Sequence, residues 1–179
     1  GRMSRCLQTL ILVRGATLDA VLSSIEEYLG RSSRPYYNVL QEVGLKKWDP
    51  TRNAAPWIRF CLQAHHFQAA KYLQRVNNAS TLWEMLEQEI KRAKLNERMV
   101  TAVFDAATRW KVRNAIYRAA VDGSISDQVA SRDLKELVRA GLLISFGNAR
   151  GRYYEASEKI KAIAAECFQK NDIPNPYEN

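Results

Sequence analysis

Two arginines at the start of the chain are the first candidates for a chemical role. Arg2 and Arg5 are separated by two residues and run into an apolar-periodic segment that begins at Cys6. At this spacing two guanidinium groups lie on one side of the opening turn of a helix, where free backbone N–H groups and the positive end of the helix dipole also point. This arrangement binds anions such as phosphates. A tag remnant followed by two surface arginines is the alternative.

A second candidate binding surface lies on the segment 127–140, which Ser126 is expected to cap. At about 100° per residue, its polar side chains fall in one sector and apolar residues such as Leu134 fall on the opposite side. The polar sector holds Gln128, Ser131, Arg132, Lys135 and Arg139. Arginine and glutamine can reach base edges, while lysine and serine can reach phosphates. Arg150 and Arg152, just beyond this helix, could follow the adjacent nucleic-acid backbone.

Five segments of the first half have apolar residues at helical spacing, and these segments would hold the arginine pair in place. They are residues 3–14, 18–29, 35–43, 56–76 and 81–94. The first segment is expected to bury one wide apolar face, which consists of Met3, Cys6, Leu7, Leu10, Ile11 and Val13. The fourth is apolar on most sides, which predicts the central helix of the first domain. Thr81 and Glu84 have the spacing of a capping box and predict a separate helix.

The second half predicts three helices, a hairpin and a last helix. A helix follows Asn96, a second spans 112–121, and the third is 127–140. Strands at 142–146 and 152–154 flank a turn at 147–151, and a final helix runs from about 155 to 170. This is the layout of a winged helix-turn-helix. The expected fold is mainly α, with a helical bundle in domain 1–95 and a winged helix-turn-helix with a small β-hairpin wing in domain 96–179.

The opening Gly1-Arg2-Met3-Ser4-Arg5 resembles the end of the Fic family signature, H-P-F-x-D/E-G-N-G-R-x-x-R, which precedes an apolar helix. Gly1 matches the last motif glycine, and Arg2 and Arg5 match the two motif arginines. Residues 24–28, the Tyr36-Tyr37-x-x-Leu40 phrase and residues 56–62 are similar, in this order, to segments that lie after the signature in Fic proteins. Residues 129–137 and the Gly-x-x-Arg-Gly-Arg-Tyr-Tyr turn resemble the winged-helix module that many Fic proteins carry at their carboxyl end.

The resemblance implies transfer of AMP from ATP to a Ser, Thr or Tyr hydroxyl of a target protein. In the family, the motif histidine is the general base, the acidic residue holds Mg²⁺, and the arginines bind the phosphate tail. The phosphate-binding residues of this chain would then be Gly1, Arg2 and Arg5. The chain lacks the motif histidine and acidic residue, so we expect an inactive fragment that binds no ATP or Mg²⁺ by itself. The family's inhibitory helix has no match in these residues.

Two other uses of the basic helix stay open. Its polar sector can be a solvated face, diluted by Asp127, Asp133 and Glu136, or a docking surface for a target protein or for a second copy of the chain. The alternative function for the whole chain is a winged-helix DNA-binding regulator, with the amino-terminal helices as an oligomerisation or effector domain. A homodimer is compatible with either function.

Composition limits the other function classes. The net charge of +8 and pI near 9.5 favour polyanionic partners. No apolar run approaches the roughly 20 residues of a membrane span, so we expect a cytoplasmic protein without membrane contact. Cys6, Cys61 and Cys167 lie far apart, and His65 and His66 are adjacent on one helix. Neither set predicts a disulfide framework or a metal site.

Overall fold

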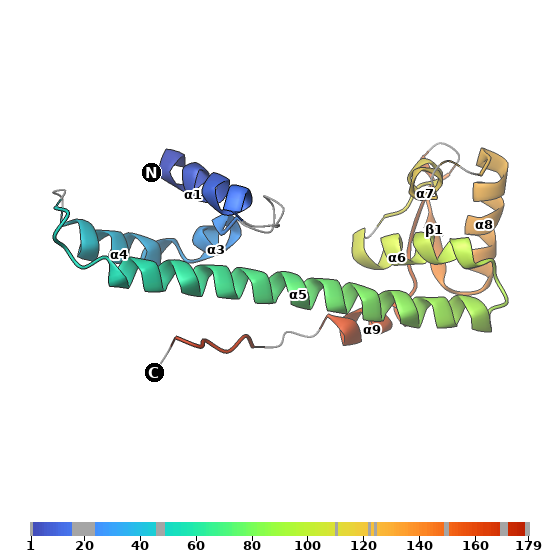
Figure 1. Cartoon of the computed structure of the whole chain (residues 1–179). Helices are drawn as coiled ribbons and strands as arrows, with labels where there is room; N and C mark the ends of the chain where they lie inside the picture. Colours follow the sequence, from blue (N-terminus) through green and yellow to red (C-terminus); the bar gives the residue numbers. More distant parts are fainter. Residues whose placement is uncertain are drawn as a thin grey trace. The chain divides into compact units, whose positions relative to one another are not determined.

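The computed structural model describes residues 2–15, 24–45, 49–109, 111–121, 123, 125–148, 151–168 and 172–177, with only the backbone at position 2 (Figure 1). Contacts divide the chain into two compact units. The first comprises Gly1–Arg75 and Asn171–Asn179, and the second comprises Val76–Lys170. We predicted a boundary near Leu95, but Leu82, Leu86 and Ile90 are buried in the core of the second unit, which therefore begins earlier.

The first unit is helical. It contains α1 (Arg2–Gly15), α3 (Glu26–Arg31), α4 (Ser33–Gly44) and the first half of α5 (Ala55–Arg92). Its small core is formed by Ile25, Leu29, Tyr36, Val39, Phe60 and Ala64. The helix that we predicted over 18–29 falls partly outside the described residues, and α3 continues past its expected end at Gly30 to Arg31.

Ion pairs join α3 to α5 within the first unit. The Glu27 carboxylate accepts two hydrogen bonds from the Arg75 guanidinium, at 2.7 and 2.9 Å, and one from Lys71 Nζ at 2.8 Å. Hydrogen bonds from Arg75 and then from Lys71 hold the pKa of Glu27 far below its usual range. Glu27 is therefore the polar contact that ties the short helix α3 to the long helix.

Helix α5 is one continuous helix of 38 residues. The prediction of two helices, with a second start at Thr81, was wrong. Residues 77–80 contain neither proline nor glycine, so no backbone hydrogen bond is lost there and the helix continues. Thr81 and Glu84 lie inside it. The backbone N–H groups there already have partners within the helix, so a capping box has no free N–H group to satisfy.

The second unit has the predicted helices and hairpin. Helices η1 (Glu97–Met99), α6 (Val100–Arg109), α7 (Asn114–Ala120) and α8 (Asp127–Arg139) precede β1 (Leu143–Phe146), β2 (Tyr153–Ala156) and α9 (Glu158–Cys167). The strands pair antiparallel, with Leu143 opposite Ala156 and Phe146 opposite Tyr153. The mainly helical fold with a small hairpin wing is thus as predicted.

Two helices begin later than predicted, because residues expected at their starts pair in the β-sheet instead. Val112 was expected to start a helix, but it exchanges backbone hydrogen bonds of 2.8 Å with Tyr154 and so extends the sheet on the other edge of β2. The final helix begins at Glu158 rather than near Glu155, because Glu155 and Ala156 belong to β2. At the hairpin turn, Gly147 has φ of +72°, and a Cβ there would lie 2.9 Å from the carbonyl oxygen of Gly151.

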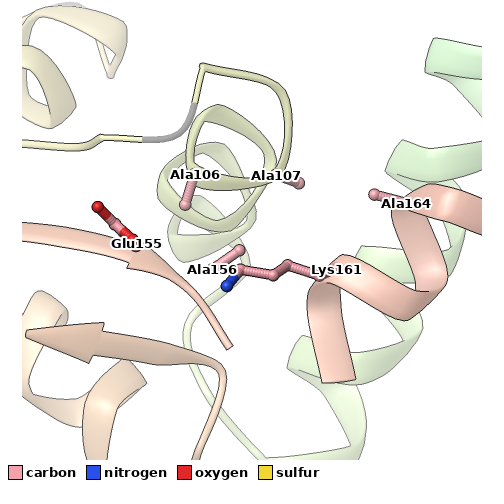
Figure 2. Close-up of a pocket in the computed structure, with 6 residues that line it drawn as sticks. All are labelled: Ala106, Ala107, Glu155, Ala156, Lys161 and Ala164. Atoms are coloured by element: carbon pink, nitrogen blue, oxygen red, sulfur yellow. The ribbon is translucent and has the colours of Figure 1, made fainter. Parts of the chain in front are cut away.

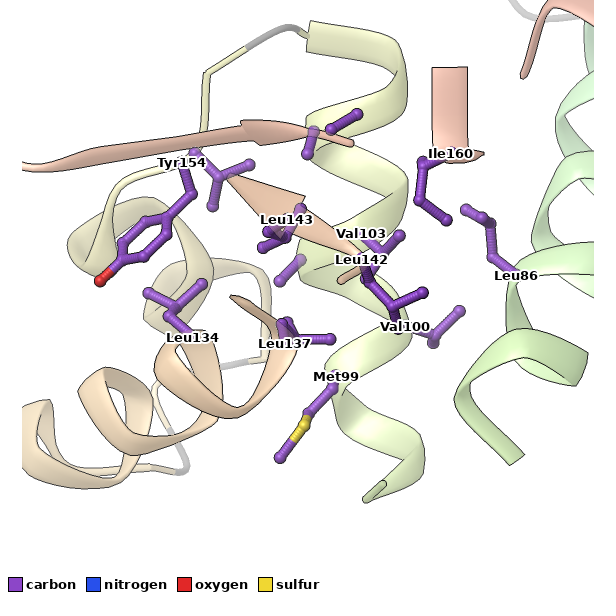
Figure 3. Close-up of a cluster of buried hydrophobic side chains, with 14 of the residues drawn as sticks. Leu86, Met99, Val100, Val103, Leu134, Leu137, Leu142, Leu143, Tyr154 and Ile160 are labelled. Atoms are coloured by element: carbon purple, nitrogen blue, oxygen red, sulfur yellow. The ribbon is translucent and has the colours of Figure 1, made fainter. Parts of the chain in front are cut away.

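The core of the second unit is formed by the facing sides of its helices and hairpin (Figure 3). Five of its side chains are each at most 2% exposed: Leu86 from α5, Leu134 and Leu137 from α8, Leu143 from β1 and Ile160 from α9.

Within the described residues, no helix combines the length and the apolar character needed to cross a membrane.

Candidate functional site

Helix α8 separates an apolar side from a polar side, as its sequence predicts. The Ser126 hydroxyl accepts a hydrogen bond from the Val129 N–H at 3.3 Å and caps the helix. Leu134 and Leu137 are fully buried, so the opposite side of the helix is turned outward. Gln128, Arg132, Lys135 and Arg139 are all exposed on that side.

Asp133 does not belong to the polar side, although we expected it to dilute the positive charge there. Its carboxylate is 2% exposed and accepts hydrogen bonds from Arg98 Nε at 2.7 Å, from Arg98 Nη2 at 2.9 Å and from the Tyr117 hydroxyl at 3.0 Å. Burial, together with the charge of Asp133, raises the pKa of Tyr117 well above its usual range. The negative charge of Asp133 is thus paired with Arg98 inside the unit. The outer side of α8 is therefore more basic than the sequence indicates.

Two adjoining open hollows bring the predicted contact residues together. The first is lined by Asp127, Gln128, Ser131, Arg132, Lys135 and Arg139. The second is lined by Lys135, Val138, Arg139, Ser145, Arg152 and Tyr154. Because Lys135 and Arg139 line both, one surface extends from α8 to the hairpin. We call it the α8–hairpin surface. Arg150 lies outside the described residues.

The cations of this surface differ in what they already contact. Arg132 Nε donates to Glu136 Oε1 at 3.0 Å, one helical turn away. Lys135, Arg139 and Arg152 are exposed and have no ion pair with any carboxylate in the part of the chain that the structure describes. These three cations are therefore available to an anionic ligand without first losing a partner.

Arg139, which the sequence places in the polar sector, lines both hollows. One further contributor to the α8–hairpin surface was not predicted from the sequence. Asn114, at the start of α7, donates hydrogen bonds to Ser131 Oγ at 2.8 Å and to the Asp127 carbonyl at 3.1 Å. Asn114 thereby orients the Ser131 hydroxyl, and nothing in the local sequence indicates this contact.

The hairpin adds an aromatic cluster that sequence reasoning also missed. Phe146 and Tyr153 stack across the strands with ring centroids 5.4 Å apart, and Lys111 Nζ lies 4.8 Å from the centre of the Tyr153 ring. Tyr154, the next residue, instead lines the hollow beside α8. Successive residues of a strand point to opposite faces, so the aromatic cluster lies on the face of the hairpin away from that hollow.

The predicted phosphate site is only partly described, because Gly1 and the side chain of Arg2 lie outside the described residues. Helix α1 begins at Arg2, so positions 2 and 5 are in its first turn. The Arg5 side chain is one-quarter exposed, and its Nη1 lies 3.2 Å from Glu26 Oε2. Its guanidinium carbon also lies 5.7 Å from the centre of the Tyr36 ring. A phosphate at Arg5 would therefore compete with the Glu26 carboxylate.

A further hollow lies between α6, β2 and α9 (Figure 2). It is lined by Ala106, Ala107, Glu155, Ala156, Lys161 and Ala164. Lys161 Nζ donates to Glu158 Oε1 at 2.8 Å, and this contact raises the pKa of Lys161. None of the predicted site residues lines this hollow.

The two histidines have separate partners. His65 Nε2 lies 3.4 Å from Gln8 Nε2, whereas His66 Nε2 lies 3.2 Å from the carbonyl oxygen of Pro174. Among the described residues, no group of three or more histidine, cysteine or acidic side chains could hold a metal ion.

Comparison with protein-family models, with curated proteins and with solved structures finds no match for this chain.

Proposed function

We propose that this chain is the carboxy-terminal part of a Fic-type protein AMP transferase, which transfers AMP from ATP to a hydroxyl of a target protein. The observation that carries the proposal is the position of the two arginines of the motif in the first turn of α1. The helices α3, α4 and α5 come next, in the order in which their sequences resemble the family. The amino end of a helix adds partial positive charge to such a pair.

In this function, Arg2 and Arg5 bind the phosphates of ATP while the backbone at Gly1 approaches them closely. Developing negative charge on the phosphates is then stabilised by positioned cations, which is the main requirement of phosphoryl and nucleotidyl transfer. The histidine and the Mg²⁺-binding acid of the motif have no match in this chain. It therefore contributes phosphate contacts, and the base and the metal ligand come from sequence that carries the rest of the motif.

The test uses the protein in which the complete motif precedes Arg5, with labelled ATP and Mg²⁺. Arg5→Ala is expected to lower AMP transfer by about tenfold or more, because a charge-assisted hydrogen bond contributes about 1.5 kcal/mol or more. Arg14→Ala removes an exposed arginine from the last turn of the same helix and is expected to change transfer less than about twofold. Equal transfer by the wild type and Arg5→Ala would remove Arg5 from the site.

A second candidate function is binding of duplex DNA by the second unit. The observation that favours it is the cluster of Lys135, Arg139 and Arg152, which are exposed, lack ion-pair partners among the described residues and line the α8–hairpin surface. In this function Gln128 and Arg132 reach base edges, and Ser131 and Lys135 reach phosphates.

The test of DNA binding is retention on duplex DNA at increasing salt. When binding depends on phosphate contacts, the logarithm of the binding constant falls linearly with the logarithm of the salt concentration. Each lost phosphate contact lowers the steepness of this line by about one. The triple variant Lys135→Ala, Arg139→Ala, Arg152→Ala is therefore expected to lose most of the salt-dependent retention. Retention of this variant equal to that of the wild type would exclude the α8–hairpin surface as the DNA site.

A further inference from the structure

Ser131 lies on α8 beside the start of α7, and its hydroxyl oxygen already has one partner. Asn114 Nδ2 donates to Ser131 Oγ at 2.8 Å and to the Asp127 carbonyl oxygen at 3.1 Å. A carbonyl oxygen can only accept a hydrogen bond. The Asp127 carbonyl therefore fixes which end of the Asn114 amide faces α8, and Ser131 Oγ is the acceptor in its contact with Asn114.

The proton of the Ser131 hydroxyl has no acceptor among the residues that the structure describes. Inside a helix, a hydroxyl side chain often donates to the carbonyl four residues earlier, as Thr108 does to Phe104 at 2.8 Å. For Ser131 that carbonyl belongs to Asp127, which accepts from Asn114 instead. Asn114 Oδ1 is buried without a hydrogen-bond partner, so it does not take the proton either. Ser131 lines the first hollow of the α8–hairpin surface, and its proton is available to a ligand there.

The neighbours of Ser131 in this hollow indicate which ligand atom fits. Arg132 and Lys135 line the same hollow and are exposed, and their side chains donate hydrogen bonds without accepting any. The Asp127 carboxylate also lines the hollow, but it is exposed and its Oδ1 lies 3.9 Å from Arg118 Nη1. The fitting atom therefore carries lone pairs and negative charge but no hydrogen. The phosphate oxygens of a nucleic-acid backbone have these properties.

We propose that Asn114 is a positioning residue that keeps Ser131 as a hydrogen-bond donor to a phosphate oxygen of duplex DNA. This inference rests on the second candidate function, DNA binding by the α8–hairpin surface. It adds a neutral contact beside the cations and a residue outside α8 that controls this contact. Without Asn114, the Ser131 hydroxyl is free to turn back to the Asp127 carbonyl, and the ligand loses its donor.

The test measures the affinity for duplex DNA by fluorescence anisotropy over a range of salt concentrations. Ser131→Ala is expected to weaken binding about tenfold, because a hydrogen bond to a charged group is lost. The dependence on salt should stay as steep as in the wild type, because a neutral hydroxyl releases no counterion. Lys135→Ala should instead lower the steepness by about one. Ser33→Ala, which alters an exposed serine of α4, is the control and should leave affinity and steepness unchanged.

A double-mutant cycle separates positioning from a structural role of Asn114. Asn114→Ala is expected to weaken binding about threefold or more in the wild-type background. In the Ser131→Ala background it should change the affinity less than about twofold, because the hydroxyl that Asn114 positions is absent. Thermal unfolding followed by circular dichroism checks that each variant is folded at the temperature of the binding measurement. Equal weakening in both backgrounds would give Asn114 only a structural role and overturn the proposal.

Repeating the measurement on duplexes of different sequence identifies the atom that Ser131 contacts. Loss of a phosphate contact weakens binding about equally for all sequences, and this is the expected result for Ser131→Ala. A loss confined to some sequences would place the contact on a base edge and overturn the phosphate assignment.

The outcomes also separate this inference from the DNA-binding function itself. Wild-type affinity in Ser131→Ala, with binding still lost in the triple variant of Lys135, Arg139 and Arg152, would overturn the inference and leave DNA binding intact. Failure of the wild type to bind duplex DNA at low salt would overturn both.

Discussion

Arg5 shows how a single side chain can satisfy a sequence motif and also make a contact that the motif does not include. Its spacing from Arg2 predicts a phosphate ligand, and its position in the first turn of α1 is compatible with that prediction. The structure adds a carboxylate at 3.2 Å and an aromatic ring beside the guanidinium. Any anion at Arg5 has to displace Glu26, so the affinity of the site depends on this pair.

Glu26→Gln is therefore expected to strengthen phosphate binding at Arg5. Glu26 is more than half exposed, and such pairs contribute about 1 kcal/mol or less, so the gain in affinity should be about fivefold or less. Calorimetric titration with ATP at low ionic strength, of the protein in which the complete motif precedes Arg5, measures it. Glu42→Gln, which removes an exposed carboxylate from α4, is the control and should leave the affinity unchanged. A weaker affinity in Glu26→Gln would contradict a phosphate role for Arg5.

At the scale of elements, the continuity of α5 is the main departure from the predicted organisation. Three of the four residues 77–80 are polar, yet their backbone continues the helix. Intrinsic propensity allows this, because asparagine and serine are only moderately unfavourable inside a helix. Buried contacts of Leu82 and Leu86 in the second unit stabilise the helix further along.

Substitution of Asn77, which is exposed on α5, tests this continuity. Asn77→Ala is expected to raise the free energy of unfolding by about 0.5 kcal/mol, and Asn77→Pro to lower it by about 3 kcal/mol or more. Urea denaturation followed by circular dichroism measures both changes. If residues 77–80 were a linker, the proline variant would instead be nearly as stable as the wild type.

The attachment of α3 to α5 through Glu27 predicts a dependence of stability on pH. The pKa of Glu27 is lowered in the folded state, so its stabilising contribution is present above the unfolded pKa of about 4.3 and is lost as the pH falls below it. The wild type should be more stable than Glu27→Gln at neutral pH, and the difference should shrink under acid conditions. Denaturation of both proteins across this pH range measures the difference, and a constant difference would contradict this role of Glu27.

At the scale of the whole molecule, net charge and the placement of charge make different predictions about DNA. The net charge of +8 alone would attract any polyanion. Some cations are already paired inside their units, as Arg98 is with Asp133 and Arg75 with Glu27. The cations of the α8–hairpin surface, which have no ion-pair partner among the described residues, are a local feature that composition does not reveal.

A charge-matched variant separates the two explanations. Alanine at Arg34, Arg59 and Lys91, all exposed and without an ion pair among the described residues, lowers the net charge from +8 to +5. The triple variant of Lys135, Arg139 and Arg152 lowers it by the same amount. We expect retention on duplex DNA to persist in the first variant and to be lost in the second, measured at equal salt. Equal losses would mean that DNA binding reflects total charge.

Features that depend on neighbouring residues could be predicted from the chain alone. The polar and apolar sides of α8, its Ser126 cap and the hairpin turn at Gly147 result from helical periodicity, capping and a positive φ. These interactions span a few residues, so the local sequence contains all the groups that make them. The mainly helical fold with a hairpin wing results from their order.

Contacts between residues far apart in the chain required the packed structure. Packing paired Arg5 with Glu26, placed Asp133 inside against Arg98, and brought Asn114 to Ser131. It also left Met3, Leu7, Leu10 and Ile11 of α1 exposed, although periodicity predicts that they lie on a buried face. The physical reason is that periodicity shows which side chains share a face, whereas partner and burial depend on packing between elements, which local sequence does not encode.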